Sequence, residues 1–165
     1  MKSYQRLIFE EINEEDINIL TPIMKRAFDN DSSIHLGKEF GGPPGYDNGD
    51  FLRKYALDKE SISYKISMNK NVIGAIILWI NNLTNQNFLG NVFIDVELEN
   101  KGIGKKVWEF IELEFPNTEV WKTETPIFSS RNHNFYVNKC GFHVVKIENP
   151  KNLEEGCFIL EKIMK

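Results

Sequence analysis

The residues best suited to chemistry lie where an apolar run gives way to an amphipathic one, in the segment "VELENKGIGKKVWEFIE" at 96–112. Gly102 and Gly104 stand directly before Lys105 and Lys106, where a helical pattern begins. The first turn of a helix carries unpaired N–H groups and the positive end of the helix dipole. Glycines let a ligand approach those groups closely, so this junction is predicted to bind an anion.

Three interpretations of the glycine turn compete. A dinucleotide-binding fingerprint needs a third glycine three residues after the second, and Val107 occupies that position. A phosphate-binding P-loop ends in Gly-Lys-Ser or Gly-Lys-Thr, and the sequence "GKK" breaks that pattern. A tight turn followed by solvated lysines remains open, because the turn alone does not decide between this interpretation and an anion site.

Composition places the chain among ordinary globular proteins. Its 165 residues are 41% hydrophobic and 27% charged, and we expect one domain spanning 1–165. The formal net charge of −4 argues against a general nucleic-acid binder, which is normally basic. Cys140 and Cys157 lack the spacing of metal ligands, so no metal site is expected. Two cysteines also argue against a disulfide framework, which indicates a reducing, cytoplasmic compartment. Neither a signal peptide nor a membrane-spanning run is present, so no membrane partner is expected.

The elements that must position the glycine turn are predicted from periodicity. Strands are expected at 4–12, 61–68, 71–80, 88–96, 118–125, 142–149 and 156–164. Helices are expected at 13–28, 50–57, from 103 onward and at 129–140. The Gly-, Pro- and Asp-rich stretch 29–49 is predicted to be a long irregular loop. This order indicates a mixed α/β sheet with helices packed on it.

Two short motifs make a family resemblance specific. The turn "ENKGIG" begins at Glu99, and "FYVNKCGF" follows about 30 residues later at the end of a predicted helix. In order, spacing and context these motifs resemble the GNAT superfamily of acetyl-CoA-dependent N-acetyltransferases. That family carries [Gln/Arg]-x-x-Gly-x-[Gly/Ala] after its fourth strand and then Phe-Tyr-x-x-x-Gly-Phe. The resemblance implies an α+β fold with a mixed, mostly antiparallel sheet of six to seven strands, flanked by helices and splayed at the fourth and fifth strands.

The resemblance also implies which anion binds. It would be the pyrophosphate of coenzyme A, with acetyl-CoA as co-substrate, and the fourth strand would pair with the pantetheine arm. An N–H near Ile94 or Asp95 would hold the developing oxyanion. Glu99 departs from the family's Gln or Arg, so its carboxylate either points away from the phosphates or lowers cofactor affinity. The expected cofactor-binding residues are Val92, Phe93, Ile94, Asn100, Lys101, Gly102, Ile103, Gly104, Lys105 and Asn132.

The catalytic groups follow from the same resemblance. The family works by direct attack of a neutral primary amine in a ternary complex, without an acyl-enzyme, so Cys140 need not be a nucleophile. Tyr136 matches the family's general acid for the leaving thiolate. Asp95 and Glu124 end the fourth and fifth strands, and either is a candidate general base. Each carboxylate is alternatively a solvated group or one that attracts a cationic substrate.

The sequence does not identify the amine that accepts the acetyl group. The loop "LGKEFGGPPGYDNGDF" at 36–51 falls where the family builds its acceptor site, and its carboxylates and aromatic rings suit a cationic or amphipathic amine. A rigid surface loop explains them equally well. Small amines, amino acids, polyamines, aminoglycosides and protein N-termini all fit, and the protein is expected to be a monomer or a homodimer. The competing functions are a non-catalytic acyl-CoA-binding module and a nucleotide-binding regulatory domain.

Overall fold

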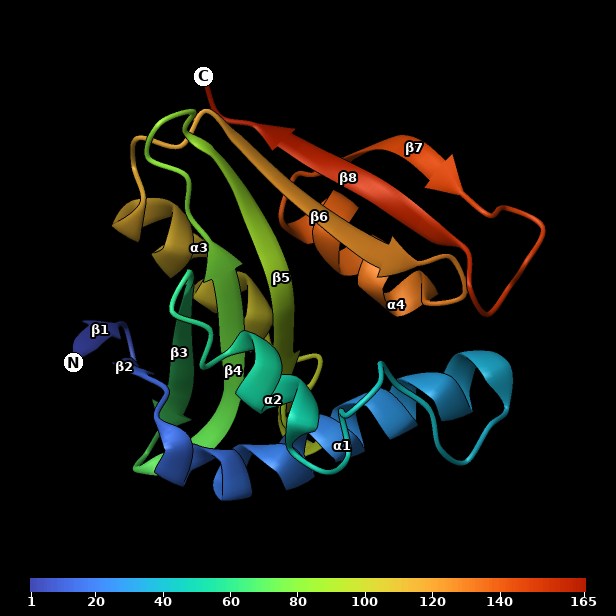
Figure 1. Cartoon of the computed structure of the whole chain (residues 1–165), viewed down its shortest axis with the longest axis horizontal. Helices are drawn as coiled ribbons and strands as arrows, with labels where there is room; N and C mark the ends of the chain where they lie inside the picture. Colours follow the sequence, from blue (N-terminus) through green and yellow to red (C-terminus); the bar gives the residue numbers. More distant parts are fainter.

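One continuous eight-stranded sheet forms the centre of the protein (Figure 1), and the computed structural model describes all residues 1–165. Its spatial order is β1-β2-β3-β4-β5-β6-β8-β7. All neighbouring strands are antiparallel except β5 and β6, which are parallel, so the predicted mixed and mostly antiparallel sheet is confirmed. The strands are β1 (Lys2–Tyr4), β2 (Leu7–Glu11), β3 (Ser61–Met68), β4 (Asn71–Trp79), β5 (Gln86–Ile94), β6 (Val120–Pro126), β7 (His143–Glu148) and β8 (Cys157–Ile163).

The sheet has one strand more than predicted because the first predicted strand is in fact a hairpin. The chain reverses at Gln5 and Arg6, and Gln5 adopts a left-handed backbone conformation with φ of 54°. Lys2 then pairs with Phe9 across the hairpin. The alternation of side chains on both sides of the turn resembles one uninterrupted strand, since no glycine or proline marks the reversal.

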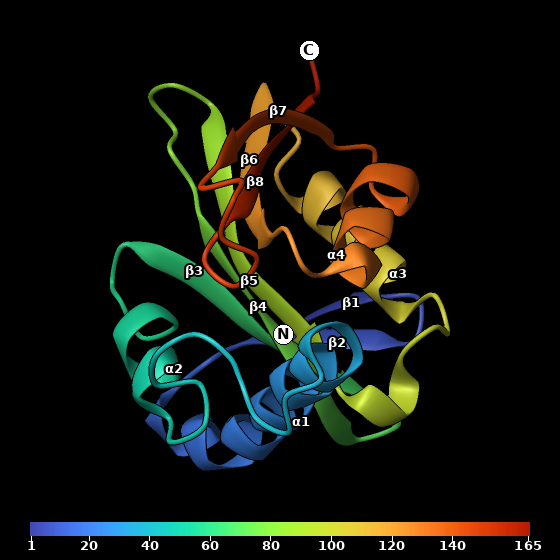
Figure 2. The ribbon, with the colours of Figure 1, turned by 90° about the vertical axis from the view of Figure 1, so that its right-hand side faces the viewer.

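Helices cover both faces of the sheet (Figure 2). Alternate residues of β4 point to opposite faces. Ala75 and Ile77 pack with α1 and α2, whereas Ile76 and Leu78 pack with α3 and η3. The helices are α1 (Ile17–Leu36), α2 (Asp50–Tyr55), α3 (Ile103–Glu114) and α4 (Ser130–His133), with the shorter η1 (Glu14–Asp16), η2 (Val96–Leu98) and the π-helical η3 (Asn134–Lys139). No helix combines the length and the apolar character that a membrane crossing requires.

Helix α1 is longer than predicted, and the predicted loop at 29–49 is wrong for its first residues. The helix continues to Leu36 and ends at Gly37, whose φ of 66° lies in the left-handed region favoured by glycine. Asp31 and Ser32 are buried in this last part of the helix. Low helix propensity of Asp, Asn and Ser is outweighed here because tertiary partners satisfy their side chains.

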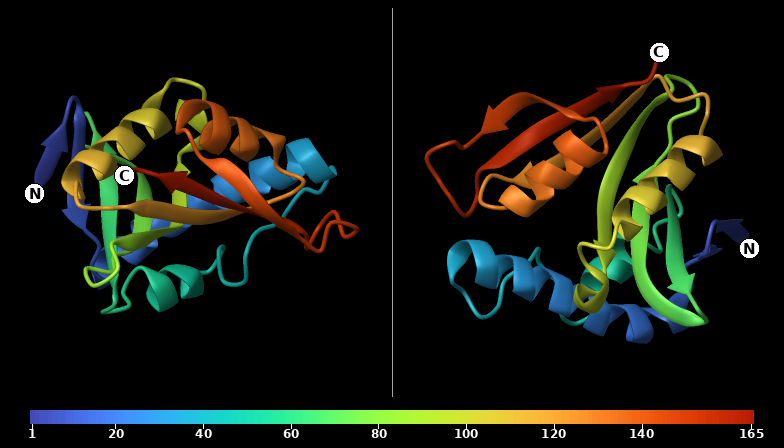
Figure 3. Two further views of the ribbon diagram at one scale, coloured as in Figure 1. Left: turned by 90° about the horizontal axis from the view of Figure 1, so that it is seen from above. Right: turned by 180° about the vertical axis from the view of Figure 1, so that it is seen from behind.

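The pairing of β5 with β6 stops after a few residues, which confirms the predicted splay. Paired positions run from Gln86 with Val120 to Phe88 with Lys122. The Thr123 hydroxyl then donates a hydrogen bond to the Leu89 carbonyl at 2.8 Å. Beyond this point the two strands diverge (Figures 1 and 3), and β6 continues beside β8 alone.

Strand β4 approaches the backbone of β5 closely at Gly74. A Cβ at this position would lie 2.1 Å from the Phe93 carbonyl oxygen on β5. We therefore predict that Gly74→Ala lowers the free energy of unfolding by about 1–3 kcal/mol, the usual cost of overpacking. Urea denaturation measures this change. As a control, Leu83→Ala alters a side chain that is 97% exposed and should shift stability by less than about 0.5 kcal/mol. An unchanged midpoint for Gly74→Ala would contradict the close approach.

Candidate active site

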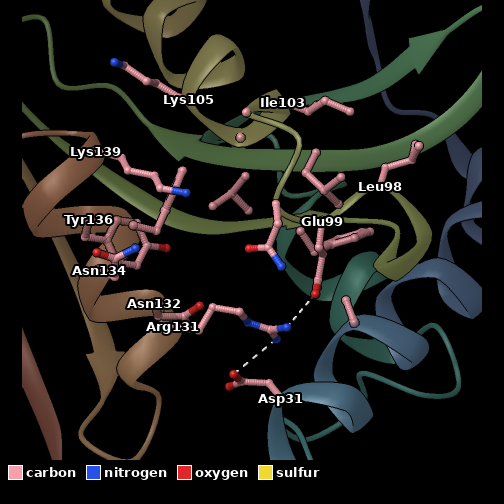
Figure 4. A pocket seen from close by; sticks show the side chains of 18 of the residues that line it. Asp31, Leu98, Glu99, Ile103, Lys105, Arg131, Asn132, Asn134, Tyr136 and Lys139 are labelled. Atoms are coloured by element: carbon pink, nitrogen blue, oxygen red, sulfur yellow. Dashed lines mark hydrogen bonds and ion pairs between the residues drawn. The ribbon is translucent and has the colours of Figure 1, made fainter. Parts of the chain in front are cut away.

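A cavity opens where β5 and β6 separate, and we call it the α3 cavity because the N-terminus of α3 forms one end (Figure 4). The end of β5, the turn before α3 and the α4–η3 segment line it. The structure brings most of the predicted site residues together here. Those that line the cavity are Val92, Phe93, Ile94, Asn100, Gly102, Ile103, Gly104, Lys105, Asn132 and Tyr136.

The two glycines of the turn, Gly102 and Gly104, are required for different structural reasons. Gly102 caps α3 with a φ of 77°, no side chain caps the helix, and an added Cβ would meet nothing within 4 Å. A Cβ on Gly104 would instead lie 2.9 Å from the Phe135 ring, which also lines the cavity. Gly102 is therefore needed for the backbone conformation and Gly104 for the packing of the ring. The uncapped N–H groups of this turn suit an anion.

The free edge of β5 faces the same cavity. The Asp95 N–H donates to the Ile73 carbonyl of the β4 side at 2.7 Å. Because N–H groups alternate in direction along a strand, those of Val92 and Ile94 point to the opposite edge, which β6 has left. This edge can accept an extended ligand as an added strand. Of the two N–H groups expected to hold an oxyanion, that of Ile94 is available and that of Asp95 is engaged.

An arginine that the sequence interpretation did not single out joins the turn to α1 (Figure 4). The Arg131 guanidinium donates to the Glu99 carboxylate at 2.5 Å and lies 3.2 Å from an Asp31 carboxylate oxygen. The Ser129 hydroxyl donates to the same Asp31 oxygen at 2.9 Å. Burial raises the pKa of Glu99, Arg131 lowers it, and Asp31 and Asp95 raise it again. The Glu99 carboxylate is therefore directed at Arg131 rather than into solvent.

Tyr136 is almost completely buried and lines the α3 cavity from η3. Its ring packs edge-on against Phe135 and Phe142, with centroid distances of 5.2 and 5.8 Å. Burial raises the pKa of the phenol well above its ordinary value, and Cys140 raises it further. A phenol is protonated at neutral pH even without this shift, and the protonated state is the one that a proton donor needs.

The two candidate bases lie in different surroundings. Asp95 accepts a hydrogen bond from the Arg26 guanidinium at 2.9 Å and caps η2 through the Glu97 N–H, and it lines neither of the two main cavities. Glu124 is exposed on β6 and lines a second cavity on the other side of the splay. Lys101 is exposed and also lies outside both linings, whereas Lys139 lines the α3 cavity beside Lys105.

The second cavity, which we call the α2 cavity, has a volume of about 690 Å³ and adjoins the first. Phe28, Asp31 and Asn132 line both cavities. From the loop predicted to form the acceptor site, the aromatic rings of Phe40 and Phe51 line it. The remaining acidic and aromatic residues singled out there, Glu39, Tyr46, Asp47 and Asp50, do not.

Sequence reasoning did not single out several residues of the α3 cavity, among them Arg131, Asp31, Phe135 and Lys139. Arg131, Phe135 and Lys139 stand within or next to the motif around Tyr136, at spacings that place them on the same helical segment. Their proximity to the motif was the available signal. Asp31 gave no signal because it falls in the stretch predicted to be irregular.

Comparison with known proteins agrees with this geometry. The model of the acetyltransferase (GNAT) family matches residues 24–142. The uncharacterized protein YrkN of Bacillus subtilis (strain 168) is 36% identical over 152 residues, which cover 90% of this chain and 79% of that protein. The chain belongs to the GNAT family of acetyltransferases.

Solved structures share the fold at low sequence identity. The PaiA N-acetyltransferase of Thermoplasma acidophilum, determined in complex with coenzyme A, has a TM-score of 0.74 at 17% identity, covering 96% of this chain and 99% of that chain. The ribosomal-protein-S18-alanine N-acetyltransferase of Escherichia coli has a TM-score of 0.72 at 13% identity, covering 96% and 94%. The GNAT-like fold expected from the sequence is confirmed.

The packing of Gly104 yields a test of the turn. Gly104→Val would push the Phe135 ring into the α3 cavity, because its Cβ would lie 2.9 Å from that ring. We predict that coenzyme A binding, measured by calorimetric titration, weakens roughly 10- to 100-fold, since overpacking costs about 1–3 kcal/mol. Lys106→Ala is the matched control, because Lys106 is exposed on the same helical turn and lies outside the lining. Unchanged affinity in a folded Gly104→Val protein would refute the assignment of the turn.

Proposed function

We propose that the protein transfers the acetyl group of acetyl-CoA to a primary amine. The observation that carries this proposal is the pair of adjoining cavities at the point where β5 and β6 separate. One cavity combines uncapped helix N–H groups with an unpaired strand edge, and the other is lined by aromatic rings and carboxylates. A donor and an acceptor bound in the two cavities would meet at their shared residues.

The residues of the α3 cavity fit coenzyme A. The N–H groups from Asn100 to Lys105 would cradle the pyrophosphate, with Lys105 and Lys139 adding positive charge. The N–H group of Val92 would pair with an amide of the pantetheine arm, which leaves the N–H group of Ile94 for the thioester. The Arg131 guanidinium offsets the negative charge that Glu99 would otherwise bring near the phosphates.

The chemistry assigned to this chain is a direct transfer. Acetyl-CoA, when bound, supplies a thioester whose carbonyl carbon is electrophilic. The amine nitrogen forms the new C–N bond to that carbon, and the C–S bond breaks. The Ile94 N–H would stabilise the developing oxyanion, and the Tyr136 hydroxyl would donate a proton to the departing sulfur.

The proton that leaves the amine needs an acceptor. Glu124 has no cationic partner and lines the α2 cavity, whereas Asp95 is held by Arg26. We therefore assign Glu124, acting directly or through water, as the base in preference to Asp95. The same carboxylate would attract the protonated amine into the cavity.

Two measurements test this proposal against the competing functions. A ligand that binds only the folded state raises the melting temperature, so acetyl-CoA should do so while NAD and ATP should not. Release of free thiol from acetyl-CoA in the presence of a panel of primary amines should then reveal turnover. Stabilisation by acetyl-CoA without thiol release from any amine would favour a non-catalytic acyl-CoA-binding module. Stabilisation by NAD or ATP alone would refute the proposal.

Tyr136→Phe tests the proposed acid, because it removes the hydroxyl and keeps the packed ring. We predict that kcat falls roughly 10²- to 10⁴-fold, the usual contribution of one general acid. Acetyl-CoA affinity should change little, since the lost interaction belongs to the transition state. Tyr4→Phe is the matched control, because its hydroxyl bonds Glu109 away from both cavities. Wild-type turnover in Tyr136→Phe would exclude the acid role.

A further inference from the structure

The α2 cavity is lined by a connected series of aromatic side chains. Ring centroids of Phe51 and Tyr55 are 4.7 Å apart, those of Tyr55 and Trp79 are 6.2 Å apart, and those of Trp79 and Phe88 are 6.4 Å apart. All four side chains are half-buried and line the cavity. Aromatic rings gain energy from offset or edge-on contact with another ring, and part of this surface is free to make such a contact.

Gly90 leaves room for the Trp79 indole to lie against the sheet. A Cβ at Gly90 would lie 2.2 Å from one carbon of the Trp79 indole and 2.9 Å from a second. Only glycine therefore allows the indole to lie across β5 at this point. Because Trp79 is half-buried and lines the cavity, its ring presents the surface that β5 does not cover to a ligand.

Two residues that line the same cavity carry buried polar atoms with no hydrogen-bond partner. The Asn91 side-chain oxygen and the Thr125 hydroxyl are buried, make no hydrogen bond and belong to residues that line the cavity. The last paired residues of β5 and β6 are Phe88 and Lys122. Asn91 lies three residues after Phe88 on β5, and Thr125 lies three residues after Lys122 on β6. Buried polar atoms cost free energy unless they are paired, so a ligand that donates N–H bonds there would be favoured.

Four carboxylates line the α2 cavity, and two of them have cationic partners. The Glu154 carboxylate pairs with Lys38 at 2.7 Å, and Asp31 is held by Arg131. The other two, Glu124 and Glu155, have no cationic partner. The aromatic series is an apolar surface and supplies no carboxylate. The cavity therefore matches a ligand with a cationic end and a flat apolar body, within the volume typical of small-molecule sites.

We infer that the acceptor is an arylalkylamine, with its aromatic ring stacked on Trp79 and its amine directed at Asn91 and Glu124. This inference rests on the proposed function and names the substrate class of the same site. Trp79 is then a specificity-determining residue, because it recognises the ring and lies away from the bonds that form and break.

The test compares matched amines in the thiol-release assay. 2-Phenylethylamine should have a kcat/KM roughly tenfold above that of 2-cyclohexylethylamine, which has the same length but no flat π-face, and above that of spermidine or an N-terminal alanine peptide. Trp79→Leu should reduce the preference for the phenyl compound to less than about twofold and leave the KM for acetyl-CoA unchanged. Phe115→Leu, an aromatic substitution outside both cavities, should retain it.

A second readout separates this inference from the proposed function. Calorimetric titration of 2-phenylethylamine and 2-cyclohexylethylamine into the protein saturated with coenzyme A measures recognition without turnover. Tighter binding of the phenyl compound, lost in Trp79→Leu, would support the inference even if no amine released thiol and acetyl transfer were refuted. Thiol release that is fastest with spermidine or the peptide, or equal binding of the two matched amines, would overturn the inference while leaving acetyl transfer in place.

Discussion

The architecture of the site depends on the end of one hydrogen-bonded ladder, where β5 ceases to pair with β6 after Phe88. If β5 and β6 were paired along their whole length, β5 would have no free edge here, and no room for a ligand would remain between the two strands. The Thr123 hydroxyl closes the paired region by donating a hydrogen bond to the Leu89 carbonyl, and Gly74 allows β4 to approach the backbone of β5 closely. Both cavities then lie against the two sides of this division.

Arg131 partly offsets the negative charge of two carboxylates where β5 and β6 separate. Its guanidinium contacts Glu99 on the turn before α3 and Asp31 on α1, so segments far apart in the chain meet at one side chain. Two carboxylates near the turn before α3 would repel an anion bound there, and the arginine reduces that repulsion. The raised pKa of Glu99 shows that burial, rather than its ion pair, dominates the environment of this carboxylate.

The sequence predicted the parts of the molecule in which local pattern and final structure agree. The glycine turn, the helix after it and the motif around Tyr136 are local patterns, and the family resemblance that they carry implied that they share one site. The end of α1 and the β1–β2 turn were not predictable in this way. Asp31 is stabilised in its helix by Ser129 and Arg131, which lie about 100 residues away, and such distant contacts leave no periodic signal.

The two cavities draw on the chain in different ways. The α3 cavity is built mainly from the continuous stretch 92–105 and the segment 131–139, whereas the α2 cavity gathers side chains from segments spread between Phe28 and Cys157. Most α2 positions can therefore vary without altering the donor side. Under the proposed function, such a division would let acceptor preference change while the residues that bind the acyl donor are kept. Selection for a new amine would be restrained chiefly at Phe28, Asp31 and Asn132, which serve both halves.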